Sequence, residues 1–324
     1  MKALLFGIFL ISAPFFAKAQ SNNSTVFRFL DVTPSAYSAA LGGNHAGLFN
    51  PDFSLYHTNP AYLSGSNTGD ISASFVNYLA DSRMGFLNTA LKLDASQTLG
   101  FGIRFMGYGD FQSLDEDGNN LGNFSAIDLA LSGAYSYLIS ERWSVGGELN
   151  YIYSSYEQYK SSAVAGTAGL HYQNTESHFS FGAVVKNLGT QLTTYNGLME
   201  PLPLDISIGV AKKPVGFPAE LSFTMRRLND WDMRIFGEES KPAFIDNIVR
   251  HAVFGGQFFL SENFKFRLGY NHYLHELNKT SDNFDFAGMS LGVGFKVKEF
   301  IIDLSRNSYS KSGGVVLLSI KTKL

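Results

Sequence analysis

Bulky apolar side chains alternate with small or polar ones at every second position along most of the chain. Within residues 98–108, Phe101 and Phe105 point to one side of an extended strand, whereas Gly102 and Arg104 point to the other. A soluble β-sandwich would bury the bulky face, whereas a membrane β-barrel would turn it toward lipid and keep the small and polar face inside. Alternation alone therefore fits both folds.

The length and number of the predicted strands favour the barrel. Most of them have nine or more residues, which is what a tilted strand needs to cross a bilayer, whereas strands of soluble proteins usually have about five or six. We expect fourteen strands, at 70–79, 84–94, 98–108, 124–138, 143–155, 162–173, 178–188, 204–213, 218–228, 249–260, 263–275, 285–297, 300–309 and 313–324.

The predicted connections alternate in length. Four are very short, at 95–97, 140–142, 261–262 and 299. Four others are long, near 109–123, 189–203, 229–248 and 276–284. Short periplasmic turns and long surface loops are typical of outer-membrane barrels. The chain is therefore predicted to be an all-β, fourteen-stranded antiparallel transmembrane β-barrel over residues 70–324, integral to the outer membrane and in contact with its lipid.

The N-terminus predicts export. Lys2, an apolar stretch at 3–16 and a small-x-small site at 17–19 are typical of a cleaved signal peptide over residues 1–19. Removing its two lysines leaves 23 basic residues against the 28 acidic ones, so the mature chain offers no basic surface for nucleic acid. The chain has no cysteine, which excludes disulfides and thiolate chemistry.

Residues 20–69 do not alternate and contain several turn signals, including Gly42-Gly43 and Asn59-Pro60. A short helix is expected at 35–41. A fourteen-stranded barrel has a lumen wide enough to leak unless something fills it. We therefore expect residues 20–69 to form a plug, or hatch, inside the barrel; a periplasmic tail or a lid is the alternative.

Two stretches carry a family resemblance. Ala-Ala-Leu-Gly-Gly at 39–43, followed by Asn59, Pro60 and Ala61, resembles the N-terminal hatch of FadL-type barrels. Gly-Tyr-Asn-His at 269–272, with the final hairpins, resembles the outer-membrane family of PorQ and PorV in the type IX secretion system of Bacteroidetes. The resemblance covers nearly the whole mature chain, but residues 273–275 are less basic than expected.

Charged residues on the inward faces are expected to pair across the lumen or with the plug, and a role in selectivity is the alternative. They are Arg104, Glu148, Lys186, Arg226 and Arg267.

The predicted loop at 229–248 is unusually apolar. Trp231, Phe236 and Phe244 suggest either a docking site for a partner or a lid packed on the barrel mouth. Ser240 and Pro242 predict the start of a short helix within this loop.

No catalytic cluster and no cofactor site is expected. His272 and His275 would lie on opposite faces of a strand, and the calcium-like stretch at 115–119 lacks the required Gly and Glu. The resemblance implies a non-enzymatic component of type IX secretion that anchors a surface partner, PorZ in the known systems, for cargo attachment. The alternative is a FadL-like transporter of small hydrophobic molecules.

Overall fold

The computed structural model describes residues 25–323 except 80, 115, 116, 118, 236, 280–284 and 310–312. The predicted signal peptide at 1–19, the first residues of the predicted plug, and Phe236 lie outside the described residues.

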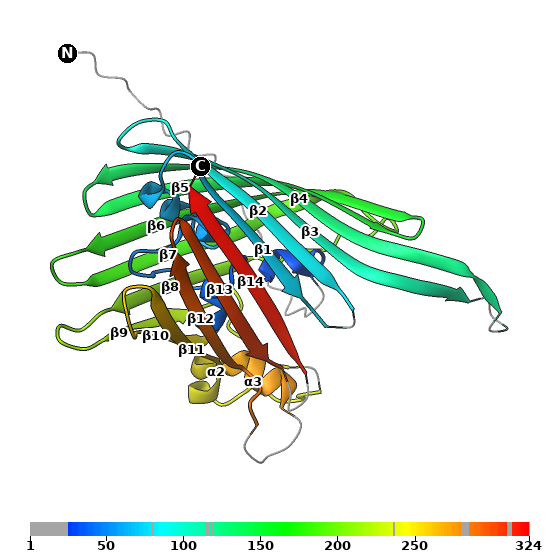
Figure 1. Cartoon of the computed structure of the whole chain (residues 1–324). Coiled ribbons are helices and arrows are strands. Elements are labelled where there is room, and N and C mark those ends of the chain that lie inside the picture. Colours follow the sequence, from blue (N-terminus) through cyan, green and yellow to red (C-terminus); the bar gives the residue numbers. More distant parts are fainter. Residues whose placement is uncertain are drawn as a thin grey trace, which may run out of the picture.

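Fourteen antiparallel strands form one closed barrel in which each strand pairs with its neighbours in sequence (Figure 1). The barrel closes where β1 pairs with β14, from Asp70 opposite Lys323 to Asn77 opposite Val316. This confirms the predicted fold. The strands are β1 (Asp70–Asn77), β2 (Arg83–Lys92), β3 (Gln97–Leu114), β4 (Asn120–Ser140), β5 (Trp143–Tyr156), β6 (Tyr159–Asn174), β7 (Phe179–Thr193), β8 (Asp205–Lys212), β9 (Ala219–Met225), β10 (Ala252–Phe259), β11 (Phe264–Asn271), β12 (Met289–Val297), β13 (Phe300–Ser308) and β14 (Gly314–Lys323).

Burial along the strands is the inverse of that in a water-soluble protein. On β3, Phe101 and Phe105 are 50% and 44% exposed, whereas Arg104 between them is 1% exposed. The bulky face therefore points outward and the polar face inward, as in a barrel surrounded by lipid. No helix in the described part of the chain is long and apolar enough to cross a membrane.

The wall differs in height around the barrel. The five strands β3 to β7 have 14 to 21 residues, whereas β8 to β11 have only seven or eight. The predicted loop at 109–123 was therefore too long, because β3 and β4 occupy most of it. A bulge between Gly107 and Asp110 interrupts the alternation there, but pairing resumes beyond it.

The two ends of the barrel differ in their connections. At the turn end, connections such as 141–142 and 298–299 are short. At the opposite end, which we call the loop end, the longest connections are 194–204, 226–251 and 272–288. Two other loop-end connections, 78–82 and 157–158, are also short, so the predicted alternation in length holds only in part.

Two short helices lie in the long loop-end connections. The predicted helix after Ser240 is present as α2 (Phe244–Arg250), but it begins later than predicted and has no side-chain cap. The predicted strand at 263–275 ends at Asn271, where α3 (His272–Asn278) begins. Asn271 accepts the backbone N–H of Leu274 at 3.1 Å, and this cap turns the chain from strand to helix.

Residues 25–69 form four short helices: η1 (Arg28–Asp31), α1 (Ala36–Ala40), η2 (Phe53–His57) and η3 (Pro60–Gly65), drawn in blue in Figure 1. The short helix predicted at 35–41 is present as α1, with Ser35 as its N-cap: the Ser35 hydroxyl accepts the N–H of Tyr37 at 3.3 Å. Most side chains from 26 to 63 are buried. They contact inward-facing groups of the strands, for example Ala36, whose N–H donates to Ser319 Oγ on β14 at 2.8 Å. We call residues 25–69 the inner segment.

Candidate functional site

Glycines on the inner wall let the inner segment approach the strand backbone closely. A Cβ atom on Gly182 of β7 would lie 1.8 Å from the carbonyl oxygen of Ala46. A Cβ atom on Gly47 would lie 2.2 Å from the carbonyl oxygen of Gly209 on β8. Neither position can carry a side chain without moving the backbone, so the inner segment and the wall meet directly at these strands.

The predicted motif Asn59, Pro60 and Ala61 lies at one of these contacts. Asn59 caps η3, since its Oδ1 accepts the N–H of Ala61 at 3.1 Å. Its Nδ2 donates to the carbonyl oxygens of Ala46 at 2.9 Å and of Leu170 on β6 at 3.1 Å. One amide therefore joins two parts of the inner segment to the wall, which gives the motif a structural role.

A second anchor is His45, which is fully buried. Its Nε2–H donates to the carbonyl oxygen of Leu41 at 2.9 Å, which leaves Nδ1 to accept from the Thr224 hydroxyl at 3.1 Å. The pKa of His45 is lowered to about 4, chiefly by burial; the hydrogen bond to Leu41 opposes this shift, and nearby Arg226 adds to it. His45 is therefore neutral at pH 7.

Two of the predicted lumen charges meet beside η2. Glu148 of β5 lies 2.6 Å from Nδ1 of His57 and 3.7 Å from the guanidinium of Arg104. Arg104 also donates to Asn150 Oδ1. All three side chains are at most 3% exposed. The inner segment therefore supplies one partner of a buried charge network, and the wall supplies the others.

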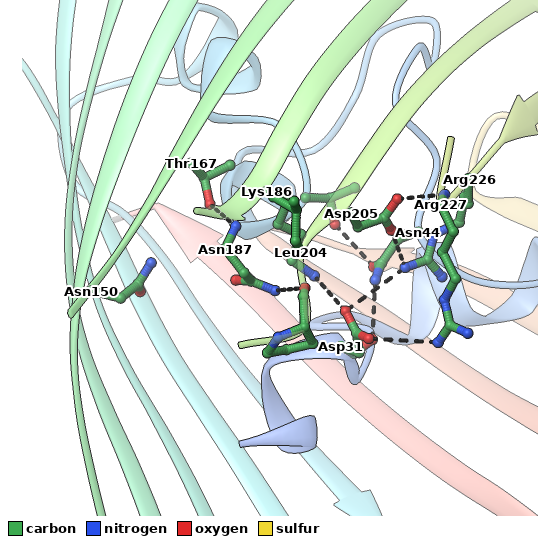
Figure 2. Close-up of polar contacts among 12 residues, drawn as sticks. Asp31, Asn44, Asn150, Thr167, Lys186, Asn187, Leu204, Asp205, Arg226 and Arg227 are labelled. Carbon is green, nitrogen blue, oxygen red and sulfur yellow. Dashed lines mark hydrogen bonds and ion pairs between the residues drawn. The ribbon is translucent and has the colours of Figure 1, made fainter. Parts of the chain in front are cut away.

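Two more of the predicted charges surround Asp31, at the end of η1 (Figure 2). The Asp31 carboxylate lies 3.8 Å from Lys186, 3.9 Å from Arg226 and 3.8 Å from Arg227. None of these separations is a direct hydrogen bond. By contrast, Asp205 accepts from Nε of Arg226 at 2.9 Å. Asp31 is thus held by surrounding positive charge rather than by close contacts.

The fifth predicted charge, Arg267, lies toward the turn end. It donates to Asp303 Oδ1 at 2.6 Å and to Gln257 Oε1 at 2.7 Å. Lys321 lies 3.1 Å from the second oxygen of Asp303 and also pairs with Asp52 of the inner segment. This network lines a cavity of about 540 Å³. A second cavity, of about 370 Å³ at the loop end, shares no lining residue with it.

An apolar cluster inside the barrel was not predicted. Six side chains of the inner segment belong to it and are at most 9% exposed: Val26, Phe27, Phe29, Leu30, Ala36 and Ala39. They pack against apolar side chains that point inward from the strands: Val76, Met84, Phe86, Met106, Ala130, Ile152, Ala163, Ala165, Val315 and Leu317. The lumen of a membrane barrel is usually polar. Met84, Phe86 and Met106 are bulky residues on the otherwise small or polar face, and this signal was available in the sequence.

The wall itself is irregular between β6 and β7. Pairing breaks at Thr167, and Asn187 opposite adopts a left-handed conformation with φ of 59°. The Asn187 N–H donates to Thr167 Oγ1 at 3.4 Å, and its Nδ2 donates to the carbonyl oxygen of Pro203 at 3.0 Å (Figure 2). Buried Lys186 lies beside this break, so the break does not continue the apolar cluster.

The predicted docking residues Trp231 and Phe244 are exposed, whereas another apolar residue of the same loop is buried. Trp231 is 48% exposed and stacks on His251 with ring centroids 4.9 Å apart. Phe244 is 70% exposed, whereas Met233 of the same loop is 4% exposed and lines the loop-end cavity. The connection therefore covers the barrel mouth with Met233 and presents Trp231 and Phe244 outward.

Metal ligands do not gather in the described residues: no group of three or more His, Cys, Asp or Glu could hold an ion. His272 and His275 lie on α3 rather than on a strand, so their rings face each other at 6.0 Å, contrary to the prediction of opposite faces. Most of the calcium-like stretch at 115–119 lies outside the described residues.

Comparison with known proteins identifies the fold. No protein-family model and no curated protein matches the sequence. Solved structures do match: the Pseudomonas putida toluene transporter TodX is 13% identical with a TM-score of 0.57, over 90% of this chain and 98% of that one. The monoaromatic hydrocarbon channel CymD is 15% identical with a TM-score of 0.57, over 92% of this chain and 99% of that one.

A Pseudomonas aeruginosa FadL homologue is 15% identical with a TM-score of 0.53, over 90% of this chain and 98% of that one. The chain therefore has the fold of FadL-type outer-membrane barrels. Its resemblance to the PorQ and PorV family stays a prediction.

Proposed function

We propose that this protein is a non-enzymatic outer-membrane barrel that takes up small hydrophobic molecules, as a FadL-like transporter. The observation that carries the proposal is the apolar cluster inside the lumen. An aqueous pore has no use for inward-facing Met84, Phe86 and Met106, whereas a site for an apolar solute needs such a lining. The solved neighbours named as a toluene transporter and a monoaromatic hydrocarbon channel support this function over the alternatives.

In the proposed mechanism, the solute exchanges with the inner segment's own side chains. Phe27 and Phe29 each place one phenyl ring in the apolar cluster, and a monoaromatic solute has the same size and polarity. Burying a side chain of this kind contributes about 1.5–3 kcal/mol, and a solute of equal area would recover that amount. Exchange therefore needs little net free energy if η1 can move.

In this mechanism, η1 detaches from the wall where Asp31 is held only by long ion pairs. Its ion pairs of 3.8–3.9 Å lack the short hydrogen bonds that make a charge pair rigid. Lys186, Arg226 and Arg227 would attract the carboxylate back after the solute has passed. Positive charge at this place thus favours the closed arrangement without locking it.

The test is toluene binding and uptake by Phe29→Ala, a variant that empties part of the cluster. We expect the purified variant to bind toluene more tightly than the wild-type chain, since the solute no longer competes with a phenyl ring. The matched control is Phe75→Ala, because Phe75 of β1 is 50% exposed on the outer face. Equal toluene binding by both variants and the wild-type chain, together with unchanged uptake by a deletion strain, would refute transport.

The second candidate is the secretion accessory implied by the PorQ and PorV resemblance: a barrel that anchors a surface partner of the PorZ kind for cargo attachment. The specific observation in its favour is Trp231, which lies half exposed at the loop end and is fixed by stacking on His251. Fixed, exposed tryptophans are typical anchors of protein interfaces. The close contact between the inner segment and the wall at Gly182 also suits an anchor that need not open.

The experiment that separates the two candidates uses Trp231→Ala in intact cells. An accessory predicts that the surface partner is released and cargo misplaced, while toluene uptake stays normal. A transporter predicts that Phe29→Ala changes toluene uptake while the surface partner and the cargo stay in place. It also predicts no cargo defect for Trp231→Ala. Heat-modifiable migration on a gel controls for the folded barrel in each variant.

A further inference from the structure

We propose that α2 is a lipid-contacting shoulder of the barrel, with its apolar side inserted among the acyl chains of the outer leaflet. Phe244 and Ile245 would then belong to the membrane-facing surface of the protein. The inference rests on the membrane setting of the barrel and on neither candidate function.

The first argument is the height of the wall. A strand of eight residues is about 26 Å long and, at a tilt of about 40°, spans about 20 Å of the membrane. The apolar band of an outer-membrane barrel is about 25 Å tall. Strands β8 to β11, with seven or eight residues each, therefore fall short of the full band on one side.

The second argument is the orientation of α2. Of its polar residues, Asn247 and Arg250 are 6% and 4% exposed and Asp246 is partly buried, whereas Phe244 and Ile245 are 70% and 75% exposed. A helix on a protein surface in water shows the opposite distribution. The barrel strands have this same inverse pattern where they face lipid, so α2 matches the strands and not a hydrated loop.

Position supports the same conclusion. Helix α2 is followed directly by β10, one of the short strands, after His251 alone. Phe254 on the outer face of β10 is 46% exposed, so apolar surface continues from the strand toward the helix. Figure 1 shows α2 and α3 together at the ends of these strands.

The polar side of α2 is held to the protein by charge. Arg250 lies 2.7 Å from Glu238, 2.9 Å from Asp246 and 3.6 Å from Glu276. The Arg250 hydrogen bond holds the pKa of the Glu238 carboxyl below its usual range. These acids neutralise the buried guanidinium and fix which side of the helix points outward.

Single cysteines can report the surroundings of α2, since the chain has no cysteine of its own. We would label Phe244→Cys and Ile245→Cys with an environment-sensitive fluorophore and reconstitute each in vesicles containing doxyl-labelled phospholipid. The lipid-facing reference is Phe254→Cys. The matched control is Leu198→Cys, because Leu198 is 68% exposed on the loop-end connection that follows the tall strand β7.

We expect both α2 labels to lose as much emission to the doxyl lipids as the reference does, with a comparable blue shift, and the Leu198 label to lose almost none. Quenching of the α2 labels no greater than at Leu198 would overturn the proposal and return Phe244 to the predicted docking surface. Two neighbouring positions guard against one variant failing to fold. Toluene binding depends on the interior cluster, so this outcome is independent of the transport test.

Discussion

Placing one methyl group on the inner wall should detach the inner segment. In Gly182→Ala the new Cβ would meet the Ala46 carbonyl oxygen at 1.8 Å, where real contacts stay above 3.0 Å. The backbone of Ala46 and Gly47 must therefore retreat by more than an ångström. Overpacking of this kind costs about 1–3 kcal/mol.

The retreat also breaks hydrogen bonds. The Ser180 hydroxyl donates to the Gly47 carbonyl oxygen at 3.0 Å, and Asn59 Nδ2 donates to that of Ala46 at 2.9 Å. Each contributes about 0.5–1.5 kcal/mol. We therefore expect Gly182→Ala to weaken the attachment of the inner segment by about 2–6 kcal/mol.

Single-channel conductance in planar bilayers gives the readout, because a fourteen-stranded barrel with a displaced filler is wide enough to conduct. Gly182→Ala should show conducting events that the wild-type chain lacks and a lower urea midpoint. The control is Gly133→Ala on β4, since a Cβ there meets no atom within 4 Å. If the two variants match in conductance and midpoint, residues 25–69 do not fill the lumen.

Three further predictions use other parts of the molecule. Asp31→Asn should loosen η1 by about 1–3 kcal/mol, since it removes the carboxylate that lies 3.8 Å from buried Lys186, and toluene titration should then show tighter binding; unchanged affinity would contradict release of η1 at Asp31. The contribution of His45 to stability should be complete above pH 6.5 and fall by about 3 kcal/mol toward pH 4, as the unfolded chain takes up the proton that buried His45 refuses; urea midpoints should therefore fall less steeply between pH 6.5 and 4 in His45→Gln than in the wild-type chain, and equal slopes would contradict this assignment. A tag at Glu239 should be accessible on intact cells and one at Glu141 should not, and equal accessibility would overturn the orientation.

The barrel was predictable because its signal repeats along the whole chain. The alternation of Phe101 with Arg104 indicates which side of a strand faces lipid. Because the same pattern recurs in fourteen predicted strands, few folds other than a membrane barrel fit the chain. Strand ends were less predictable, since Gly107 and Gly109 mask the continuation of β3 past its bulge. Asn271 looked like the middle of a strand, but its side chain caps a helix.

The interior site was harder to predict because it depends on which residues the closed barrel brings together. Arg104, Glu148, Lys186 and Arg267 are buried strand residues, whereas Arg226 follows the end of β9. Nothing local pairs Lys186 with Asp31, which lies far earlier in the chain. The apolar cluster likewise joins the first described residues to the first strands and to the last strand of the barrel. Met84, Phe86 and Met106, bulky residues on the inward face, gave a local sign of it.

The position of the inner segment also constrains the order of assembly. Ala36 bonds to Ser319 of the last strand, 283 residues away, while Asn59 bonds to Leu170 near the middle of the wall. Closing a loop of that size costs about 5 kcal/mol of chain entropy. Because residues 25–69 contact both β14 and β6, we expect them to be in place before β1 pairs with β14. We therefore expect changes in the inner segment to appear first as slow or failed insertion into the membrane, before any loss in the stability of barrels that have already closed.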